Sequence, residues 1–296
     1  MSNVTLNTRK ERNIFNKLLV YIVFIIFAIL TISPLIWLFY SSFKPQLEII
    51  RSSLALPRDW IFSNYIQAIK IGKLNIYAIN SIIYTFVSTG LVIIFSMMAS
   101  FAFAKIKNRA TPFLYNSFLI GLLITIQAIL IPLFISMTRI GLRDTRLGII
   151  MIYVAVSLPL AIFLGTEYVK AIPDSLIESA QIDGASYFTI FIKIIMPMCK
   201  PVMVTILIFT ALACWNEFML ALVFTSSDSS RSLPVGIYSF SGPLATEYGM
   251  QFAALVIGMT PMIILYALFH KQITRGFAAG GEIGRASCRE RVLFEV

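Results

Sequence analysis

The sequence has little charge and few residues suited to acid–base or metal chemistry. Of its 296 residues, 13% are charged and 58% are hydrophobic, whereas soluble domains carry roughly 25% charged residues. It has one histidine, His270, and three cysteines, Cys199, Cys214 and Cys288, without metal-ligand spacing or a plausible disulfide pair. No Ser/His/Asp set, paired carboxylates or G-x-x-x-x-G-K-S/T loop is recognisable. These absences disfavour a membrane enzyme and exclude ATP hydrolysis by this chain alone.

The net charge of +10 does not indicate nucleic-acid binding. Its basic residues lie in short runs between apolar segments, a distribution that in membrane proteins mostly sets orientation. The sequence therefore predicts an all-α, polytopic membrane protein with a lipid bilayer, and no nucleic acid, as its surroundings.

Six apolar runs approach the length of about 20 residues that a transmembrane helix needs. The first is longer than the apolar part of a signal peptide, about 7–15 residues, and contains no small-residue cleavage site, so it is interpreted as a span. The six predicted spans are Leu18–Tyr40, Ser81–Phe103, Ser117–Met137, Leu147–Gly165, Pro201–Phe224 and Phe252–Phe269. This divides the chain into an N-terminal segment (1–17), a six-span domain (18–281) and a tail (282–296).

The basic residues favour a cytoplasmic N-terminus. A basic cluster, Arg9–Lys17, precedes the first span, and the short loop between the second and third spans, Ala104–Asn116, is also basic. With an even number of spans, both termini and the segment Thr166–Lys200 would be cytoplasmic. The long connection Ser41–Asn80 would then lie outside.

The polar segment Thr166–Lys200, here called the elbow, is predicted to form two short helices. Pro173 and the polar residues after it are a helix-start signal, Gly184 permits a sharp turn, and Pro197 closes the second helix. A structured polar segment between two spans indicates contact with a partner. The alternative is an amphipathic loop lying on the membrane surface.

The spacing Glu178-x-Ala180-x-x-Asp183-Gly184-Ala185, followed by Ile194-x-x-Pro197, resembles the EAA motif of permease subunits of bacterial ABC importers. That resemblance implies that the elbow docks on a cytoplasmic ATPase subunit. The two acids would offer acceptors, the alanines close approach, the glycine the bend and the proline the direction of the exit. The implied docking residues are Glu178, Ala180, Asp183, Gly184, Ala185 and Pro197. Ser179 departs from the motif, because the family usually has alanine there.

Further segments resemble the smaller six-span permease half of sugar importers, in the expected order. They are Ser42–Pro45, Leu56-Pro57 with Asn64-Tyr65, Gly141–Gly148, Trp215–Phe218, Leu233–Gly236 and Gly276–Gly280. The resemblance implies a bacterial inner-membrane subunit that forms half of the path for a sugar delivered by an extracytoplasmic binding protein. Its expected partners are a second permease, in a heterodimer, and an ATPase dimer. The ATPase would bind ATP and Mg, so no cofactor is expected in this chain.

The candidates for the translocation path are polar and aromatic residues within predicted spans. They are Gln127, Trp215, Asn216, Glu217 and Phe218. A lone carboxylate in a span is costly unless it faces the bundle interior or water; structural pairing of Glu217 is the alternative. On a continuous helix Trp215 and Phe218 share a face that Asn216 and Glu217 do not. Pro132 is expected to kink the third span.

The tail and the substrate leave alternatives open. Residues 282–292 resemble a translated sequencing-adapter oligonucleotide, so 282–296 is expected to be non-native; a natural basic tail is the alternative. The chain could instead belong to an importer of a non-sugar solute. A stand-alone secondary transporter would show paired intramembrane acids or inverted repeats, and none is convincing here.

Overall fold

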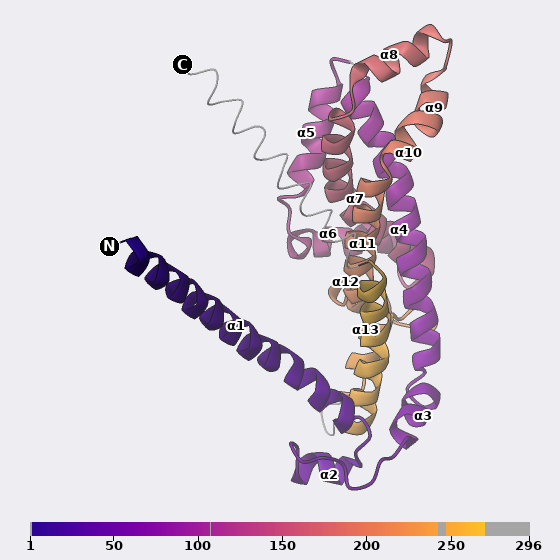
Figure 1. Cartoon of the computed structure of the whole chain (residues 1–296). Coiled ribbons are helices and arrows are strands. Elements are labelled where there is room, and N and C mark those ends of the chain that lie inside the picture. Colours follow the sequence, from indigo (N-terminus) through magenta and orange to yellow (C-terminus); the bar gives the residue numbers. More distant parts are fainter. Residues whose placement is uncertain (1, 107, 242–246, 270–296) are drawn as a thin grey trace. The chain divides into compact units, whose positions relative to one another are not determined.

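The computed structural model describes residues 2–106, 108–241 and 247–269, with side chains from Lys17 onward. The described chain is built mainly from helices (Figure 1). It divides into two compact units. Unit 1 comprises the chain up to Gly72 and Ser239–Ile257, and unit 2 comprises Lys73–Tyr238 and the chain from Gly258.

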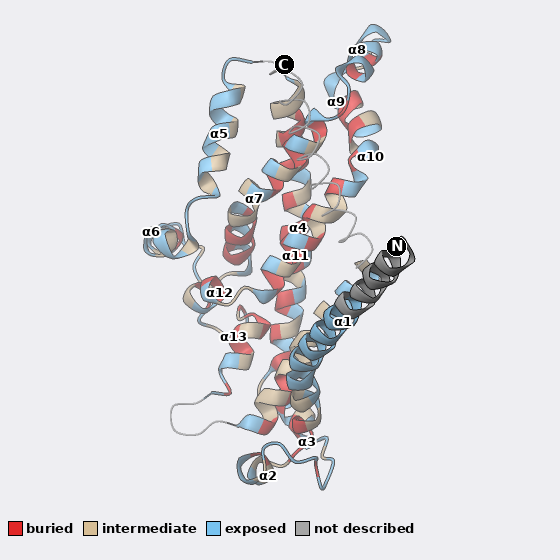
Figure 2. Ribbon diagram, turned by 60° about the vertical axis from the view of Figure 1, so that its left-hand side comes forward, coloured by how far each residue is buried: buried red, intermediate tan, exposed pale blue. Residues whose placement is uncertain are grey.

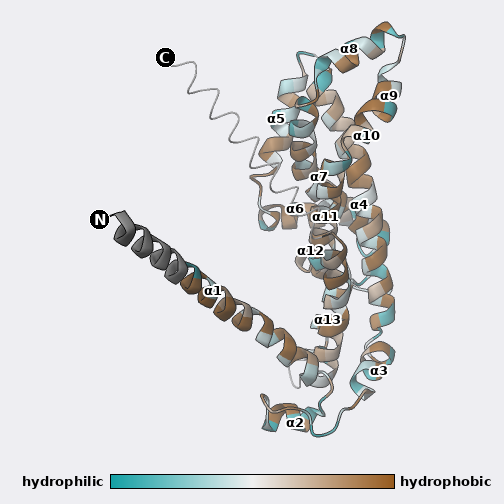
Figure 3. Ribbon diagram, in the orientation of Figure 1, coloured by the Kyte–Doolittle hydropathy of each residue, from teal (hydrophilic) through white to brown (hydrophobic). Residues whose placement is uncertain are grey.

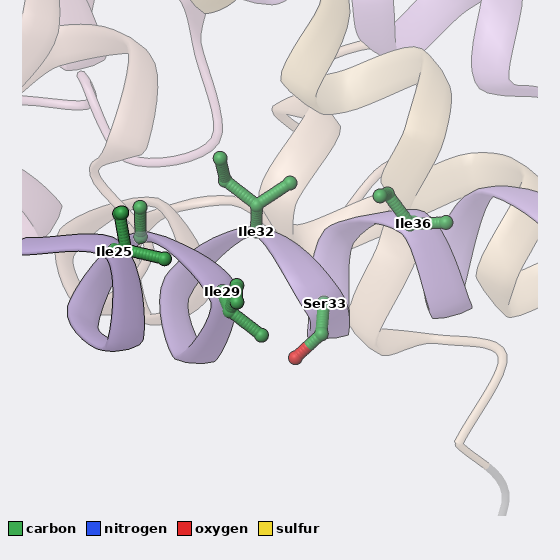
Figure 4. Close-up of a pocket in the computed structure, with 6 residues that line it drawn as sticks. Ile25, Ile29, Ile32, Ser33 and Ile36 are labelled. Atoms are coloured by element: carbon green, nitrogen blue, oxygen red, sulfur yellow. The ribbon is translucent and has the colours of Figure 1, made fainter. Parts of the chain in front are cut away.

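Unit 1 contains three N-terminal helices, α1 (Ser2–Ser41), α2 (Gln46–Arg51) and α3 (Ser63–Lys70). The apolar part of α1, Lys17–Ser41, is long enough to cross a membrane (Figure 3). Figure 4 shows isoleucines and one serine, Ser33, along this helix. All of these side chains come from α1, so they form an apolar stripe on one helix, not a substrate cavity.

A buried lysine organises the connection that follows α1. The Lys44 side chain is buried, and its Nζ donates hydrogen bonds to the carbonyls of Ser52 (3.2 Å) and Ser53 (3.0 Å). The Asn64 amide donates to the carbonyls of Ser42 (2.8 Å) and Lys44 (2.9 Å). Two of the segments that resemble sugar permeases therefore contact each other, and they hold the backbone of this connection in place.

Unit 2 is a bundle in which α4 packs along α7, and α11 packs against both (Figure 2). Ser100 Oγ on α4 donates to the Ile162 carbonyl on α7 at 3.2 Å, and a Cβ on Gly165 would lie 2.4 Å from Ser100 Oγ. Such small residues allow helices to approach closely in a membrane. The helices of unit 2 are α4 (Leu74–Lys105), α5 (Thr111–Gly121), α6 (Ile126–Arg139), α7 (Arg146–Lys170), α8 (Asp174–Ile182), α9 (Tyr187–Ile190), the π-helix η1 (Phe191–Ile195), α10 (Met196–Met198), α11 (Lys200–Asn216), α12 (Met219–Phe224) and α13 (Leu233–Tyr238).

Within the described residues, four to six segments can cross a membrane. Four are single helices: Lys17–Ser41, Leu74–Lys105, Arg146–Lys170 and Tyr248–Phe269. Two more are bent pairs, α5 with α6 at 103°, and α9–α10 with α11 at 76°. The polytopic, all-α class is confirmed, whereas the number of six spans stays a prediction.

The structure adds detail to two predictions about the spans. The second span begins at Leu74, seven residues before Ser81, so the connection after α1 is shorter than expected. The third span bends between Gly121 and Ile126, because Thr125 has an extended backbone (ψ 141°) that ends helical geometry before α6. Pro132 lies inside α6, and the kink expected there stays a prediction.

Candidate functional site

The turn of the elbow is a Schellman motif centred on Gly184. The Gly184 amide donates to the Gln181 carbonyl (3.0 Å), and the Ala185 amide donates to the Ala180 carbonyl (2.9 Å). Gly184 has φ +81°, the left-handed conformation that glycine adopts at this position of a helix end. A Cβ built on Gly184 would meet no atom within 4 Å. The glycine is therefore favoured by its backbone conformation and not by a lack of space.

The second half of the elbow starts at once after this turn. Ser186 Oγ accepts from the Thr189 amide (3.3 Å) and so caps α9. The π-helix Phe191–Ile195 follows, and the chain then bends by 76° into α11. The elbow thus contains two short helical segments, α8 and α9–α10, joined by a turn of defined geometry.

Some residues of the elbow pack against the rest of unit 2, and others are exposed. Ile177 and Ala180 of α8 are buried, and Ala185 is half-buried. Six exposed residues of the elbow, together called the outer elbow face, are not covered by this chain: Glu178, Ile182, Asp183, Gly184, Phe188 and Pro197. Ala180 and Ala185 therefore pack within this chain, and the acids and the apolar tips are the groups left available to a partner.

The fifth span is not one helix, contrary to the prediction for Pro201–Phe224. α11 ends at Asn216, and Glu217 has an extended backbone (ψ 120°). The Glu217 carboxylate then accepts from the amides of Leu220 (2.9 Å) and Ala221 (3.2 Å), which caps α12. The structural alternative for Glu217 is thus supported, although its partners are backbone amides and not a cation.

The other path candidates do not converge in the described structure. Trp215 is buried, and its Nε1 donates to the Gly258 carbonyl at 3.1 Å. The exposed Asn216 amide donates to the Leu212 carbonyl of its own helix at 3.0 Å. Phe218 stacks edge-on against Tyr238, with ring centroids 5.3 Å apart. The shared face expected for Trp215 and Phe218 is lost, because the helix ends between them.

Gln127 is exposed near the start of α6, away from the break at Glu217 in sequence. Gln127 is therefore not covered by other residues of this chain. Among the described path candidates, only Glu217 caps a helix with its side chain. The path candidates stay predictions.

A second polar site, which the sequence did not reveal, is formed by Asp144 and the segment Ser226–Leu233. Asp144 has φ +57°. Its carboxylate accepts from the amides of Ser226 (2.7 Å) and Ser227 (3.0 Å) and from the Ser230 hydroxyl. Partial burial raises the pKa of Asp144, but these hydrogen bonds lower it more, to about 2. The carboxylate is thus ionised at neutral pH, and it fixes the start of the segment.

The start of α4 holds the same segment from another side. Tyr77 Oη donates to Asp228 (2.8 Å), and Lys73 forms an ion pair with Asp228 that lowers the pKa of this carboxyl. The Asn80 amide donates to the carbonyls of Ser229 (3.0 Å) and Arg231 (2.9 Å). The segments Gly141–Gly148 and Leu233–Gly236, which both resemble sugar permeases, thus flank one hydrogen-bonded cluster.

Comparison with known families decides the identity of this fold. Residues 93–278 match the family described as "Binding-protein-dependent transport system inner membrane component", and these residues include the elbow, the Asp144 cluster and the break at Glu217. The chain belongs to this family. It is thus a transport permease subunit and a multi-pass membrane protein.

Several relatives of this permease have curated names. The multiple sugar-binding transport system permease protein MsmG of Streptococcus mutans is 35% identical over 92% of this chain and 99% of its own length. The diacetylchitobiose uptake system permease protein NgcG of Streptomyces coelicolor is 31% identical over 86% of this chain and 85% of its own. The arabinooligosaccharides transport system permease protein AraQ of Bacillus subtilis is 28% identical over 88% and 94%.

The permease also has the fold of a solved transporter. A chain in the crystal structure of a bacterial ABC transporter involved in the import of the polysaccharide alginate matches with a TM-score of 0.79. The match covers 88% of this permease and 97% of that chain, at 24% identity. At that identity the similarity shows the shared fold.

Sequence reasoning missed Asp144 and Asp228 as organising residues. A local signal for the backbone of Asp144 was present, because aspartate is one of the few residues that adopt a left-handed backbone. Within the described residues, no group of three or more His, Cys, Asp or Glu could hold a metal ion. His270, the segment Gly276–Gly280 and the tail 282–296 lie outside the described residues.

Proposed function

We propose that this permease is one of two transmembrane subunits of an ATP-driven importer, and that it forms half of the path for a sugar. Its family is named for binding-protein-dependent transport. The relatives MsmG, NgcG and AraQ are named for a multiple sugar-binding system, diacetylchitobiose and arabinooligosaccharides. The shared theme of these names is a carbohydrate, which supports a sugar as the substrate here.

The elbow carries the coupling part of the proposal. Its outer face presents two carboxylates, Glu178 and Asp183, beside the exposed apolar side chains Ile182 and Phe188. A surface that combines charged acceptors with apolar tips on short capped helices suits docking into a groove of another protein. We assign this groove to an ATPase subunit. The elbow and both termini of this chain then lie on the cytoplasmic side of the membrane.

In this proposal ATP binding closes the ATPase dimer, and the docked elbows of two permeases move with it. The spans then open toward an extracytoplasmic binding protein, which releases the sugar. The permease itself supplies no catalytic group. ATP and Mg are bound by the ATPase subunits, and the second permease completes the path in a heterodimer. The basic N-terminus supports the orientation.

Charge reversal at the elbow tests the proposal. The permease is expressed with the second permease and the ATPase encoded beside it, and co-purification and uptake of labelled oligosaccharides are measured together. Glu178→Lys reverses an exposed charge of the outer elbow face and is expected to detach the ATPase and abolish uptake. Lys193→Ala removes an exposed charge from the π-helix of the same elbow and is the matched control.

The outcomes separate the parts of the proposal. Normal co-purification and uptake in Glu178→Lys would falsify the assignment of the outer elbow face to the ATPase. An intact complex that imports an amino acid or polyamine, and no oligosaccharide, would contradict the sugar assignment alone.

A further inference from the structure

Helix α4 is the long uninterrupted element of unit 2. It contains 32 residues, Leu74–Lys105, without proline, and is about 48 Å long at 1.5 Å per residue. By contrast, α7 contains Pro159, and α11 ends at the break before Glu217. A helix without proline or a break keeps its hydrogen-bond ladder, and therefore moves as one piece.

One end of α4 is fastened to the elbow by a buried cation. Lys105 is the last residue of α4, and its side chain is only 3% exposed. Its Nζ donates to the Ile172 carbonyl (2.5 Å) and to Asp174 Oδ1 (2.7 Å), at the start of α8. A buried ammonium that loses such acceptors costs much free energy, so this contact resists separation.

An aromatic contact adds a second attachment one turn away. The Phe101 ring lies 5.6 Å from Phe191 and 6.5 Å from Tyr187, measured between ring centroids. The end of α4 therefore contacts both halves of the elbow, α8 through Lys105 and α9–η1 through Phe101. This end of unit 2 lies at the top of Figure 1.

The other end of α4 is fastened to the segment Ser226–Leu233. Asn80 donates to two carbonyls of this segment, and Tyr84 Oη donates to the Ser230 carbonyl at 2.7 Å. Ser81 Oγ accepts from the Leu233 amide at 2.8 Å. One stiff helix thus joins two polar sites that are far apart along the bundle.

We propose that Lys105 is a positioning residue that transmits movement of the elbow to α4, and that α4 carries this movement to the segment Ser226–Leu233. The inference rests on the proposed docking of the elbow on an ATPase. The elbow is also joined to α7 and α11 through the chain itself. Lys105 adds a direct, non-covalent link to the one long helix of the described bundle that has neither a proline nor a break.

The test uses the complex with its ATPase in lipid nanodiscs, trapped with ATP and orthovanadate. Asn75→Cys places a label at the exposed start of α4, after Cys199, Cys214 and Cys288 are changed to alanine. The measured quantity is the change in maleimide labelling rate on trapping. Lys105→Met keeps the length of the side chain without its charge, and is expected to reduce this change at least fivefold. Lys105→Arg is expected to retain it.

A control variant separates the effect of removing a lysine charge from the effect of removing the link between the elbow and α4. Lys170→Met removes an exposed lysine at the end of α7 that pairs with Glu167 at 2.8 Å, and should leave the change in labelling intact. Since Lys105 is buried, ATPase co-purification should be normal in Lys105→Met. If this variant does not accumulate in the membrane, Asp174→Asn weakens the same contact from its exposed partner and should also reduce the change.

One result overturns the proposed function, and two others overturn the role of Lys105. Failure of the unmutated permease to bind the ATPase overturns the proposed function. Normal ATPase binding, with the same labelling change in Lys105→Met (or Asp174→Asn) as in the unmutated protein, overturns the role of Lys105 alone. That role is also overturned if trapping leaves the start of α4 unchanged in the unmutated complex.

Discussion

Replacing Gly184 by alanine isolates the contribution of the elbow turn to docking. Gly184 has φ +81°, and a Cβ built there meets no atom within 4 Å. The change therefore causes no clash with neighbouring groups, and its whole cost is conformational. Holding alanine in the left-handed region costs about 1–2 kcal/mol. The undocked elbow of the variant relaxes out of this turn. Docking then has to restore the left-handed backbone, so about the same 1–2 kcal/mol is lost from the binding free energy.

The expected result is a loss of ATPase affinity of about 5- to 30-fold, because 1.4 kcal/mol corresponds to a factor of ten. Gly184→Asn should stay within about threefold of the unmutated permease, since asparagine tolerates the left-handed region at helix ends. Gly184→Asp tolerates the same backbone but adds a carboxylate beside Asp183. A greater loss for aspartate than for asparagine would measure the effect of that charge.

The assay is titration of purified ATPase onto nanodiscs that contain the permease pair, with uptake measured in proteoliposomes. Gly141→Ala is the matched control, because Gly141 also has a positive φ (+71°) with no atom within 4 Å of its Cβ position. It should destabilise its own loop without changing ATPase affinity. Unchanged affinity in Gly184→Ala, or an equal loss in Gly141→Ala, would refute the reasoning.

Three further predictions concern side chains whose roles the structure explains. Asp144→Asn should destabilise the permease by about 2 kcal/mol. Because the pKa of Asp144 is lowered to about 2 in the fold, the difference in Tm from the unmutated protein should be constant above pH 5, decline below about pH 4 and disappear only below about pH 2. Lys44→Met removes a donor from the carbonyls of Ser52 and Ser53, of which Ser53 keeps the Trp37 indole as a donor; it should cost about 1–3 kcal/mol and increase proteolysis of the connection after α1, and an unchanged cleavage rate would contradict this. Glu217→Ala should lower the Tm by removing the cap of α12, about 1 kcal/mol, whereas Glu217→Gln retains an acceptor and should keep both Tm and uptake; lost uptake at an unchanged Tm in Glu217→Gln would instead indicate a substrate contact.

Local sequence patterns predicted the parts of this permease that depend on neighbouring residues. The apolar runs give the all-α membrane class, because a helix in lipid must satisfy its own backbone hydrogen bonds. Gly184 predicts a turn between two short helices, because the left-handed backbone of a Schellman motif is a local requirement. The motif around Glu178 and Asp183 points to the family, which residues 93–278 then match.

Other features were decided by contacts between residues that are distant in the sequence. Nothing near Asp144 predicts that its carboxylate binds Ser226 and Ser227, 82 and 83 residues later. The break of the fifth span at Glu217 was also missed, because apolar residues continue on both sides of it and hydropathy does not register a backbone turn.

Lys44 and Lys105 show the same limit of sequence-based prediction for charged residues. Sequence counting treats a lysine as a solvated charge that sets orientation. In the fold both are buried, Lys44 on two backbone carbonyls and Lys105 on a carbonyl and a carboxylate. The sequence by itself determined that these runs of apolar residues become helices in a membrane and that the elbow turns at a glycine. Only the tertiary structure decided which charges leave water, because burial depends on acceptors that the folded chain brings from elsewhere.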